Sequence, residues 1–170
     1  MVDFEVTDLP ETDHVDVGEQ APDFERPLVN DEFWEDVALS DLTADGPVLL
    51  VFHPMDGAFP ATYVWNEIRD REWRSEFDAR VVGCSISSAY EHKDRIEDSA
   101  IDASLFSDPA ADVAAAYGVE NDLDGMAGVT EHRPAVYLID GERVVQYAWV
   151  AEQWPDFPPY DEIEDELADL

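Results

Sequence analysis

The sequence is poor in cysteine, in basic residues and in long apolar runs, and each shortage excludes a class of protein. Cys84 is the only cysteine among the 170 residues, so we expect no intrachain disulfide and no cysteine-based zinc site. Only 9 residues are lysine or arginine against 42 that are aspartate or glutamate, so nucleic acid and anionic membrane surfaces are excluded as partners. The longest uninterrupted apolar run, Val48–Phe52, is far too short to cross a membrane.

What remains is the composition of a folded, intracellular protein. The chain is 45% hydrophobic and 11% aromatic, enough for a sizeable core, and its length favours one domain. The first residues, Met1–Glu5, are acidic where a secretory signal would be basic. We therefore expect a cytoplasmic protein.

The excess of acidic residues points to a habitat. The formal net charge is -33, Lys93 is the only lysine, and the acidic residues are spread along the whole chain. Such charge repels itself in dilute buffer unless concentrated cations screen it. The pattern resembles proteins of extreme halophiles, and it predicts folding that depends on salt. An acidic protein that binds cations or basic partners is the alternative.

Two parts of the chain differ in character. Residues 1–16 form an acidic N-terminal extension, with one short strand expected at Phe4–Val6, and residues 17–170 form the folded domain. Short apolar runs predict strands, and apolar residues spaced by four, with capping residues, predict helices. The strands are expected at Val48–Phe52, Arg80–Ile86, Leu105–Phe106, Ala135–Ile139 and Val144–Trp149, and the helices at Ala61–Phe77, Ser88–Ser99, Asp108–Tyr117 and Tyr160–Leu170.

The order of these elements defines a fold class. Strands that alternate with helices imply parallel pairing, and Asp140-Gly141 between the last two strands is typical of a hairpin turn. Val17–Phe24 contains Gly18 and Pro22, residues typical of loops, and is expected to be a loop that leads into an edge element. The sequence therefore predicts an α/β protein, a thioredoxin-like mixed β-sheet with helices on both faces.

A series of short segments, met in order along residues 17 to 167, resembles one known family. They are Val17–Phe24, Leu39–Leu42, Val51–Asp56, Arg69-Asp70, Val82–Ser85, His92-Lys93, Ser107–Pro109, Ala116–Val119, Arg133–Asp140 and Tyr147–Trp149. The resemblance is to the peroxiredoxins of the alkyl hydroperoxide reductase/thiol-specific antioxidant group. The resemblance implies the thioredoxin fold and the activity of a thiol-dependent peroxidase. Such an enzyme needs no cofactor.

The resemblance fails at the catalytic motif, P-x-x-x-T-x-x-C. Pro54 keeps the proline, but an ungapped count places Ala58 at the threonine and Ala61 at the cysteine. A register with one inserted residue places Thr62 there, and a hydroxyl is not oxidised as a thiolate is. In either register the nucleophile is missing. We expect no catalytic residue, and a vestigial peroxide pocket formed by Pro54, Ala58, Ala61 and Arg133.

Three other side chains each have a functional and a structural interpretation. Arg133 matches the arginine that binds peroxide in the family, so it either contacts a small anion or holds a carboxylate. His53 either lines the old pocket or is a satisfied, partly buried histidine. Cys84 is a possible redox thiol, but its place inside a strand favours an inert, buried side chain.

No metal site is expected from the sequence. The four histidines show no ligand spacing, and acidic pairs are too abundant to single one out. Self-association as a homodimer is expected from the resemblance, because peroxiredoxins commonly dimerise. Some of the tryptophans Trp65, Trp73, Trp149 and Trp154 would then lie in an interface, or all of them would cap the core.

Three functions from different classes remain. The first is a non-catalytic thioredoxin-fold protein that has lost the peroxidatic cysteine. The second is a thiol-dependent peroxidase or oxidoreductase with antioxidant activity, which uses Cys84 or a partner thiol. The third is a module that binds an anion or small molecule in the vestigial pocket.

Overall fold

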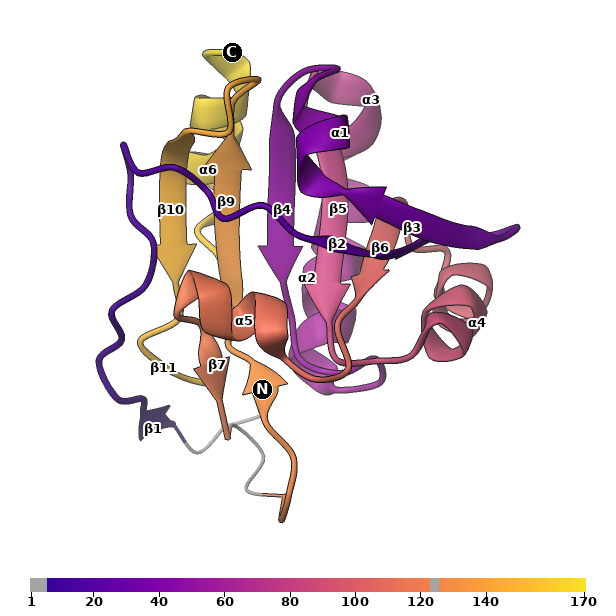
Figure 1. Ribbon diagram of the computed structural model, residues 1–170, viewed down its shortest axis with the longest axis vertical. Coiled ribbons are helices and arrows are strands. Elements are labelled where there is room, and N and C mark those ends of the chain that lie inside the picture. The colour runs from indigo at the N-terminus through magenta and orange to yellow at the C-terminus, as the bar shows by residue number, and fades with distance from the viewer. Residues whose placement is uncertain (1–5, 123–125) are drawn as a thin grey trace.

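The computed structural model describes residues 6–122 and 126–170, and its centre is a seven-stranded mixed sheet (Figure 1). The strand order is β10-β9-β4-β5-β6-β2-β3. Its strands are β2 (Glu25–Val29), β3 (Trp34–Ala38), β4 (Val48–Phe52), β5 (Arg80–Ser85), β6 (Ser104–Ser107), β9 (Ala135–Ile139) and β10 (Val145–Val150). Two small pairs lie outside it, β1 (Thr7–Asp8) with β11 (Gln153–Trp154) and β7 (Glu120–Asn121) with β8 (Glu131–His132).

Helices cover both faces of this sheet. They are α1 (Leu39–Thr43), α2 (Phe59–Asp70), α3 (Trp73–Glu76), α4 (Ala89–Ser99), α5 (Asp112–Tyr117) and α6 (Tyr160–Ala168). Buried residues of α1 and α5 pack in one hydrophobic cluster, and those of α2, α3, α4 and α6 pack in a second. The first group lies in front of the sheet in Figure 1, and α2 and α6 lie behind it. The predicted fold class is confirmed.

Strand β4 separates the two clusters. All five of its residues are buried, as expected for a strand between two others with helices on both sides. Because successive side chains alternate, Val48, Leu50 and Phe52 belong to the α1/α5 cluster, while Leu49 and Val51 belong to the other. β4 pairs in parallel with β5 and antiparallel with β9, which confirms its predicted central position.

The predicted helix over Ala61–Phe77 is two helices. α2 begins two residues earlier, at Phe59, and ends at Asp70. Glu72 then takes a left-handed backbone conformation (φ 56°), so the chain turns before α3 begins. A glutamate gives no sequence signal for this conformation, which glycine adopts far more readily. Phe77, predicted to be the end of the helix, has extended backbone.

The predicted N-terminal cap is present in α4, but the predicted start of α5 is wrong. Ser88 caps α4, and its Oγ accepts the backbone N–H of Glu91. Asp108 does not begin a helix with Pro109, because α5 starts only at Asp112. The Oδ2 atom of Asp108 still accepts hydrogen bonds from the first turn of α5. Asp108 therefore caps the helix from four residues away.

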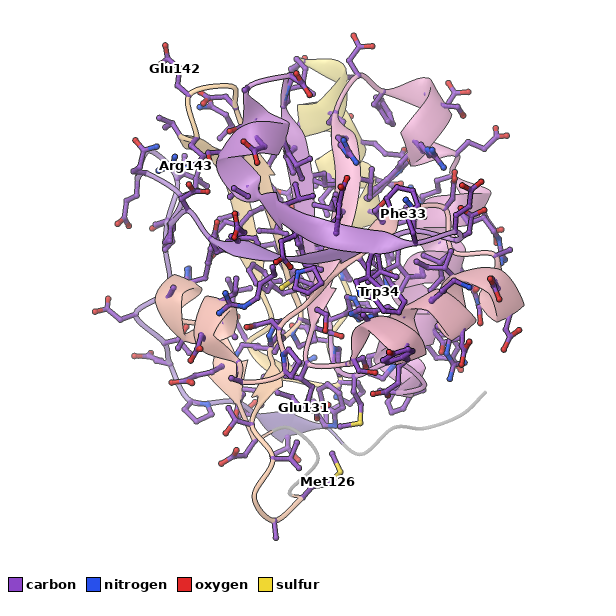
Figure 2. All side chains as sticks on the ribbon, turned by 45° about the vertical axis from the view of Figure 1, so that its right-hand side comes forward. Phe33, Trp34, Met126, Glu131, Glu142 and Arg143 are labelled. Atoms are coloured by element: carbon purple, nitrogen blue, oxygen red, sulfur yellow. The ribbon has the colours of Figure 1, made fainter. Side chains whose placement is uncertain are left out.

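A hairpin that the sequence analysis missed lies in the N-terminal third. β2 and β3 pair antiparallel, and β2 also pairs with β6, so the loop before β2 leads to the second strand from the edge and not to the edge. Asn30 closes the turn by accepting two backbone N–H groups through its Oδ1. Phe33 and Trp34 lie at this end of the sheet, far from Glu142 and Arg143 at the β9–β10 turn (Figure 2).

The C-terminal elements follow the prediction closely. β9 and β10 form the expected antiparallel hairpin, with Asp140 accepting backbone N–H groups across the turn. α6 begins at the predicted Tyr160 and ends two residues before Leu170. Within the described ranges, no helix combines the length and the apolar composition that a membrane crossing requires.

The first described residues run along the body of the protein. Of the strand expected at Phe4–Val6, the first two residues lie outside the described ranges, and the first strand is β1. Val15 donates its backbone N–H to the carbonyl of Tyr117, and its own carbonyl accepts the hydroxyl of Tyr137. These bonds fix residues 13–15 against the end of α5.

Candidate functional site

The candidate site lies where β4, β5 and β6 end. The three strands are parallel to one another, so their carboxyl ends meet at one edge of the sheet, the usual place for a site in such folds. His53 follows β4 directly, and Asp108 follows β6. The loop from Pro54 to Ala58 then leads from β4 into α2.

The first turn of α2 has neither a side-chain cap nor an acidic residue. Ala58 is its N-cap residue and makes no side-chain cap, Pro60 is in the first turn, and no acidic residue is present there. In a chain with 42 acidic residues, this leaves the positive end of the helix dipole uncompensated. Pro54 and Ala61 are buried beside this turn.

A small cleft opens beside Ala61, between α2 and α4. Asp56, Thr62, Trp65 and Arg95 are among the residues that line it. The volume open to the centre of a water-sized sphere is about 10 Å³, room for about one water molecule. Arg95 lies so close to Gly57 that a Cβ atom there would meet its guanidinium at 2.9 Å. The arginine beside Ala61 is therefore Arg95 of α4.

Arg133 lines a different groove from the one that contains Ala61. Its neighbours there include Thr12 and His14 of the N-terminal segment and Ala151, whose carbonyl accepts Nη1 at 3.2 Å. The side chain is 3% exposed, and its Nε finds no acceptor within the described residues. Burial alone lowers the pKa of this guanidinium. No carboxylate pairs with Arg133 among the residues that the structure describes.

Cys84 is buried on the other face of the sheet from α2. It belongs to the cluster under α1 and α5, whereas Val64, Trp65 and Ile68 of α2 belong to the opposite cluster. The thiol is fully buried, and burial, helped by the negative charge of Asp108, raises its pKa well above the ordinary value. A thiol in this state is a poor nucleophile.

His53 is more deeply buried than the sequence suggested, and it is only half satisfied. Its side chain is 1% exposed, and Nδ1 donates to the carbonyl of Pro54 at 2.9 Å. Nε2 has no partner among the described residues. Burial lowers the pKa of His53 to about 4, and the positive charges of His92 and His132 act in the same direction. The ring is therefore neutral at pH 7.

A second buried histidine holds the loop that follows β4. His92 of α4 places Nδ1 2.6 Å from Oδ2 of Asp56, and its Nε2 faces the carbonyl of Phe106 at 3.0 Å. Burial would raise the pKa of Asp56, but the hydrogen bond and charge of His92 outweigh it and lower that pKa. Ser87 holds the same loop, because its Oγ accepts the backbone N–H of Asp56 at 2.7 Å.

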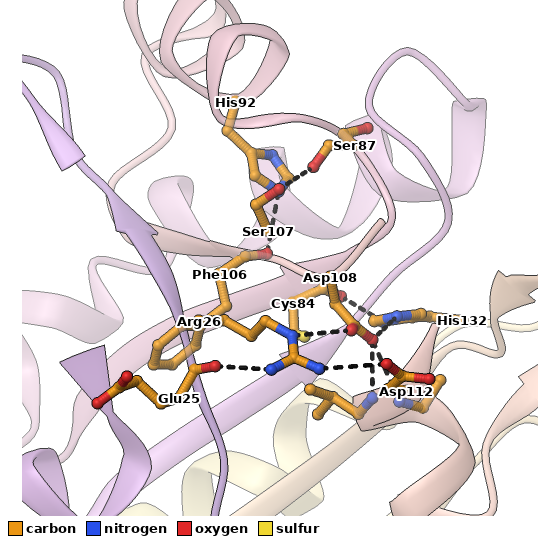
Figure 3. Close-up of polar contacts among 12 residues, drawn as sticks. Glu25, Arg26, Cys84, Ser87, His92, Phe106, Ser107, Asp108, Asp112 and His132 are labelled. Atoms are coloured by element: carbon orange, nitrogen blue, oxygen red, sulfur yellow. Dashed lines mark hydrogen bonds and ion pairs between the residues drawn. The ribbon is translucent and has the colours of Figure 1, made fainter. Parts of the chain in front are cut away.

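A third buried group lies on the Cys84 side of the sheet edge (Figure 3). Asp108 accepts a hydrogen bond from Arg26 at Oδ1 (3.3 Å), and its Oδ2 lies 2.8 Å from Nε2 of His132. Nδ1 of the same ring lies 3.0 Å from the carbonyl oxygen of Cys84. His132 and Asp108 are both completely buried.

Solved structures that resemble this arrangement of strands and helices include peroxiredoxins. The reduced 2-Cys peroxiredoxin of Plasmodium vivax superposes with a TM-score of 0.76 at 23% identity, over 91% of this chain and 96% of that one. Peroxidoxin BcpB of Mycobacterium tuberculosis gives 0.74 at 28% identity, with the same coverage. The fold is thus the thioredoxin-like fold of the peroxiredoxin class.

The sequence comparisons narrow this class to one family. The AhpC/TSA family matches residues 17–148, and the chain belongs to that family. The ycf42 protein of Pyropia yezoensis, named as a peroxiredoxin, is 32% identical over 142 residues, 79% of this chain and 68% of that protein. The chloroplastic 2-Cys peroxiredoxin BAS1 of Arabidopsis thaliana is 31% identical over 144 residues, again 79% of this chain. The match spans 52% of the length of BAS1.

Sequence reasoning missed most of the buried polar groups at this edge. Asp56, His92 and His132 carried no functional prediction, and Asp108 was predicted only as a helix cap. Their pairing cannot be read from spacing, because each partner comes from a different element. One signal was present: His53 directly follows the apolar strand Val48–Phe52, and polar residues at such strand ends often mark a site.

Proposed function

We propose that this chain is a member of the AhpC/TSA family that does not reduce peroxides. The observation that carries the proposal is the position of Cys84, whose side chain packs in the cluster on the face opposite α2. Ala61, at the position of the family's cysteine in the ungapped register, has no heteroatom. Thr62 takes the position of the family's cysteine in the register with one inserted residue. Its hydroxyl donates to the carbonyl of Ala58 at 3.4 Å.

The expected loss of rate is complete. One lost polar contact in a transition state costs about 3–4 kcal/mol, roughly 10²–10³ in rate. Ala58 removes such a contact. The loss of the thiolate at Ala61 removes the reaction path itself, because no hydroxyl is oxidised to a sulfenic acid as a thiolate is.

A peroxide-consumption assay in molar KCl with a thiol reductant tests the proposal. Wild type and Cys84→Ser should both consume hydrogen peroxide no faster than buffer. The double variant Ala58→Thr/Ala61→Cys should form a trappable sulfenic acid at residue 61, while Ala58→Thr alone should not. Turnover by wild type that disappears in Cys84→Ser would contradict the proposal and favour the alternative, a thiol-dependent peroxidase that uses Cys84.

A second candidate function, the binding of a small anion, is favoured by the groove at Arg133. A buried guanidinium without an acidic partner is costly, and a bound anion would compensate its charge. Acetate is a suitable probe. It should raise the thermal midpoint of wild type at constant ionic strength, but not that of Arg133→Lys, whose ammonium lacks the planar donor pair.

Arg74→Gln is the matched control, because Arg74 is an exposed arginine already paired with Asp102. Equal responses of all three proteins to acetate would contradict a site at Arg133. If Arg133→Lys does not fold, broadening of the arginine Nε–H resonances of wild type during the titration provides the readout. No change in those resonances would then count against the site.

We further propose that the chain forms a homodimer through the free edge of β10. This strand, V-Q-Y-A-W-V, contains no charged residue, although 30% of the chain is charged. The loop at Gly18 and Glu19 pairs with Val145 only, and beyond it no strand among the described residues pairs with the outer side of β10. Unprotected edges of this kind pair with other strands.

Sedimentation in molar salt tests the dimer. We expect a species of twice 19.1 kDa for wild type. Gln146 is the exposed residue of β10, and a charged side chain on an edge strand opposes its pairing with another strand. Gln146→Glu should therefore be a monomer with wild-type circular dichroism. A wild-type protein that sediments only at 19.1 kDa would contradict the dimer.

A further inference from the structure

We propose that Cys84, Asp108 and His132 form a binding site for one divalent transition-metal ion, with zinc as the natural candidate. A ligand atom of each residue lies within 4.8 Å of the others, and all three residues are buried. Thiolate, imidazole and carboxylate are the three side-chain ligands that zinc takes in proteins. The three come from β5, from the loop after β6 and from β8, so the ion would join segments far apart in the sequence.

The hydrogen bonds of His132 orient it as a metal ligand. Its Nδ1 faces the carbonyl oxygen of Cys84, which can only accept, so Nδ1 carries a proton. A histidine that donates one ring N–H to a backbone carbonyl while its other nitrogen faces the ion is the usual arrangement in metal sites. Here the other nitrogen, Nε2, points at Oδ2 of Asp108 from 2.8 Å.

Two lone pairs that face each other require a cation between them. With Nδ1 protonated, Nε2 and the Asp108 carboxylate are both acceptors, and either a second proton or a metal ion satisfies them. Asp108 is held in place by Arg26 at Oδ1 and by the backbone N–H groups of Val113 and Ala114 at Oδ2. These contacts would remain as the outer shell that fixes the carboxylate.

The exchange of protons for metal leaves the charge of this buried site unchanged. The metal-free site contains a neutral thiol, a His132–Asp108 pair that shares one proton between Nε2 and Oδ2, and the Arg26 guanidinium, with a sum of +1. A divalent ion that binds the thiolate, the neutral imidazole and the carboxylate, beside the same guanidinium, also gives +1. Two protons therefore leave, one from Sγ of Cys84 and one from between Nε2 of His132 and Oδ2 of Asp108, and nothing is oxidised or reduced.

The geometry requires small shifts. The ligand atoms of a tetrahedral zinc lie roughly 3.3–3.7 Å apart, given bonds of about 2.0–2.3 Å. The pair formed by Nε2 and Oδ2 would open by about 0.5 Å from 2.8 Å, and the sulfur would move toward both. No fourth protein ligand is found within the part of the chain that the structure describes.

Cobalt(II) is the probe that tests this site, because a thiolate bound to cobalt gives a charge-transfer band in the near ultraviolet. The chain is refolded from denaturant in molar KCl with cobalt present, so burial cannot prevent entry. We expect one cobalt per chain with this band, two protons released into a weakly buffered indicator solution, and displacement by zinc. The numerous surface carboxylates also bind cations, but they cannot produce a sulfur band.

The variants separate this site from the alternatives. Cys84→Ser should lose the band, and His132→Gln should weaken binding at least tenfold. His14→Gln, a matched histidine outside the cluster, should bind as wild type does. A wild-type protein without the band, or cobalt binding that is unchanged in Cys84→Ser, would overturn the proposal. If the variants do not fold, X-ray absorption at the zinc edge of wild type decides: a sulfur neighbour at about 2.3 Å supports the site, and oxygen neighbours alone refute it.

Discussion

His92, which is fully buried, contacts Asp56 at 2.6 Å between Nδ1 and Oδ2 and so links α4 to the loop that precedes α2. The other nitrogen of the ring faces the carbonyl of Phe106, so both ring nitrogens point at acceptor oxygens. His92 therefore joins the loop that follows β4 to the end of β6, and the loop that forms one wall of the Ala61 cleft is held by a buried side-chain contact.

Removal of His92 should destabilise the fold strongly. His92→Ala leaves the Asp56 carboxylate buried without its partner, and breaking such a pair costs about 3–5 kcal/mol. Denaturant unfolding at constant molar salt measures the loss. Lys93→Gln, on the next residue, removes only an exposed ion pair with Glu97 and should change stability by less than about 1 kcal/mol. Equal effects of the two variants would show that the buried contact contributes nothing special.

Stability should fall in mild acid because of His53. Its pKa is about 4 in the folded chain, against 6.5 for an unperturbed histidine. Between these two values the unfolded chain binds a proton that the folded chain does not, so unfolding is favoured as the pH falls from 6.5 to 4. The loss amounts to about 3 kcal/mol for this group and levels off below pH 4.

The comparison of wild type with His53→Gln isolates this contribution from the titration of the carboxylates. The variant should lose less stability than wild type between pH 7 and pH 4.5, and His14→Gln should follow wild type. Parallel pH profiles for all three proteins would mean that His53 titrates normally in the folded state.

Gly83 should not tolerate a methyl group. A Cβ atom on this residue of β5 would lie 2.5 Å from the Trp65 ring and 2.6 Å from Leu105, with Nε2 of His53 at 3.0 Å. Overpacking of this kind costs about 1–3 kcal/mol or more. Gly141→Ala is the control. A Cβ atom on Gly141 would lie 3.4 Å from its nearest neighbour, the carbonyl oxygen of Thr43, which is an ordinary contact distance. If Gly83→Ala and Gly141→Ala had the same unfolding midpoint, β5 and α2 would be able to move apart at little cost in stability.

Folding should require salt. A net charge of -33 on 170 residues repels itself over the ~10 Å Debye length of 0.1 M salt, which shrinks to about 3 Å at 1 M. Circular dichroism should show a largely unfolded chain in dilute buffer and native structure in molar KCl. Sucrose at equal osmotic strength controls for general solute effects. Full structure in dilute buffer would refute both the salt dependence and its halophilic interpretation.

The sequence was sufficient for the sheet and the helix faces, because those depend on local pattern. Val48–Phe52 is entirely apolar between turn residues, and Ser88 begins a capping box, so each predicts its own structure. The break at Glu72 and the delayed start of α5 were missed, since both depend on left-handed residues other than glycine. The β2–β3 hairpin was missed because its exposed strand β3 is charged, and its stability comes from pairing with β2.

The site was less predictable than the fold for a related reason. The alanines at 58 and 61 are visible in the sequence, but the partners of Asp56 and Asp108 are contributed by helices and strands far along the chain. Arg133 illustrates the difference. Its family position suggested a place beside Ala61, and the structure places it in a groove formed by the N-terminal segment, while Arg95 lies at the cleft.

The two edges of the sheet differ in charge, and this difference bears on the symmetry of any assembly. β3 exposes Glu35 and Asp36 along one edge, whereas β10 at the other edge carries no charge. Two β10 strands can meet about a two-fold axis, which uses up both free edges and closes the assembly at two copies. A head-to-tail contact of β10 with β3 would instead leave a free edge at each end and grow into a fibre. Glu35 and Asp36 on β3 oppose this head-to-tail contact. The acidic charge that destabilises the single folded chain in dilute buffer therefore also limits the number of copies that can join.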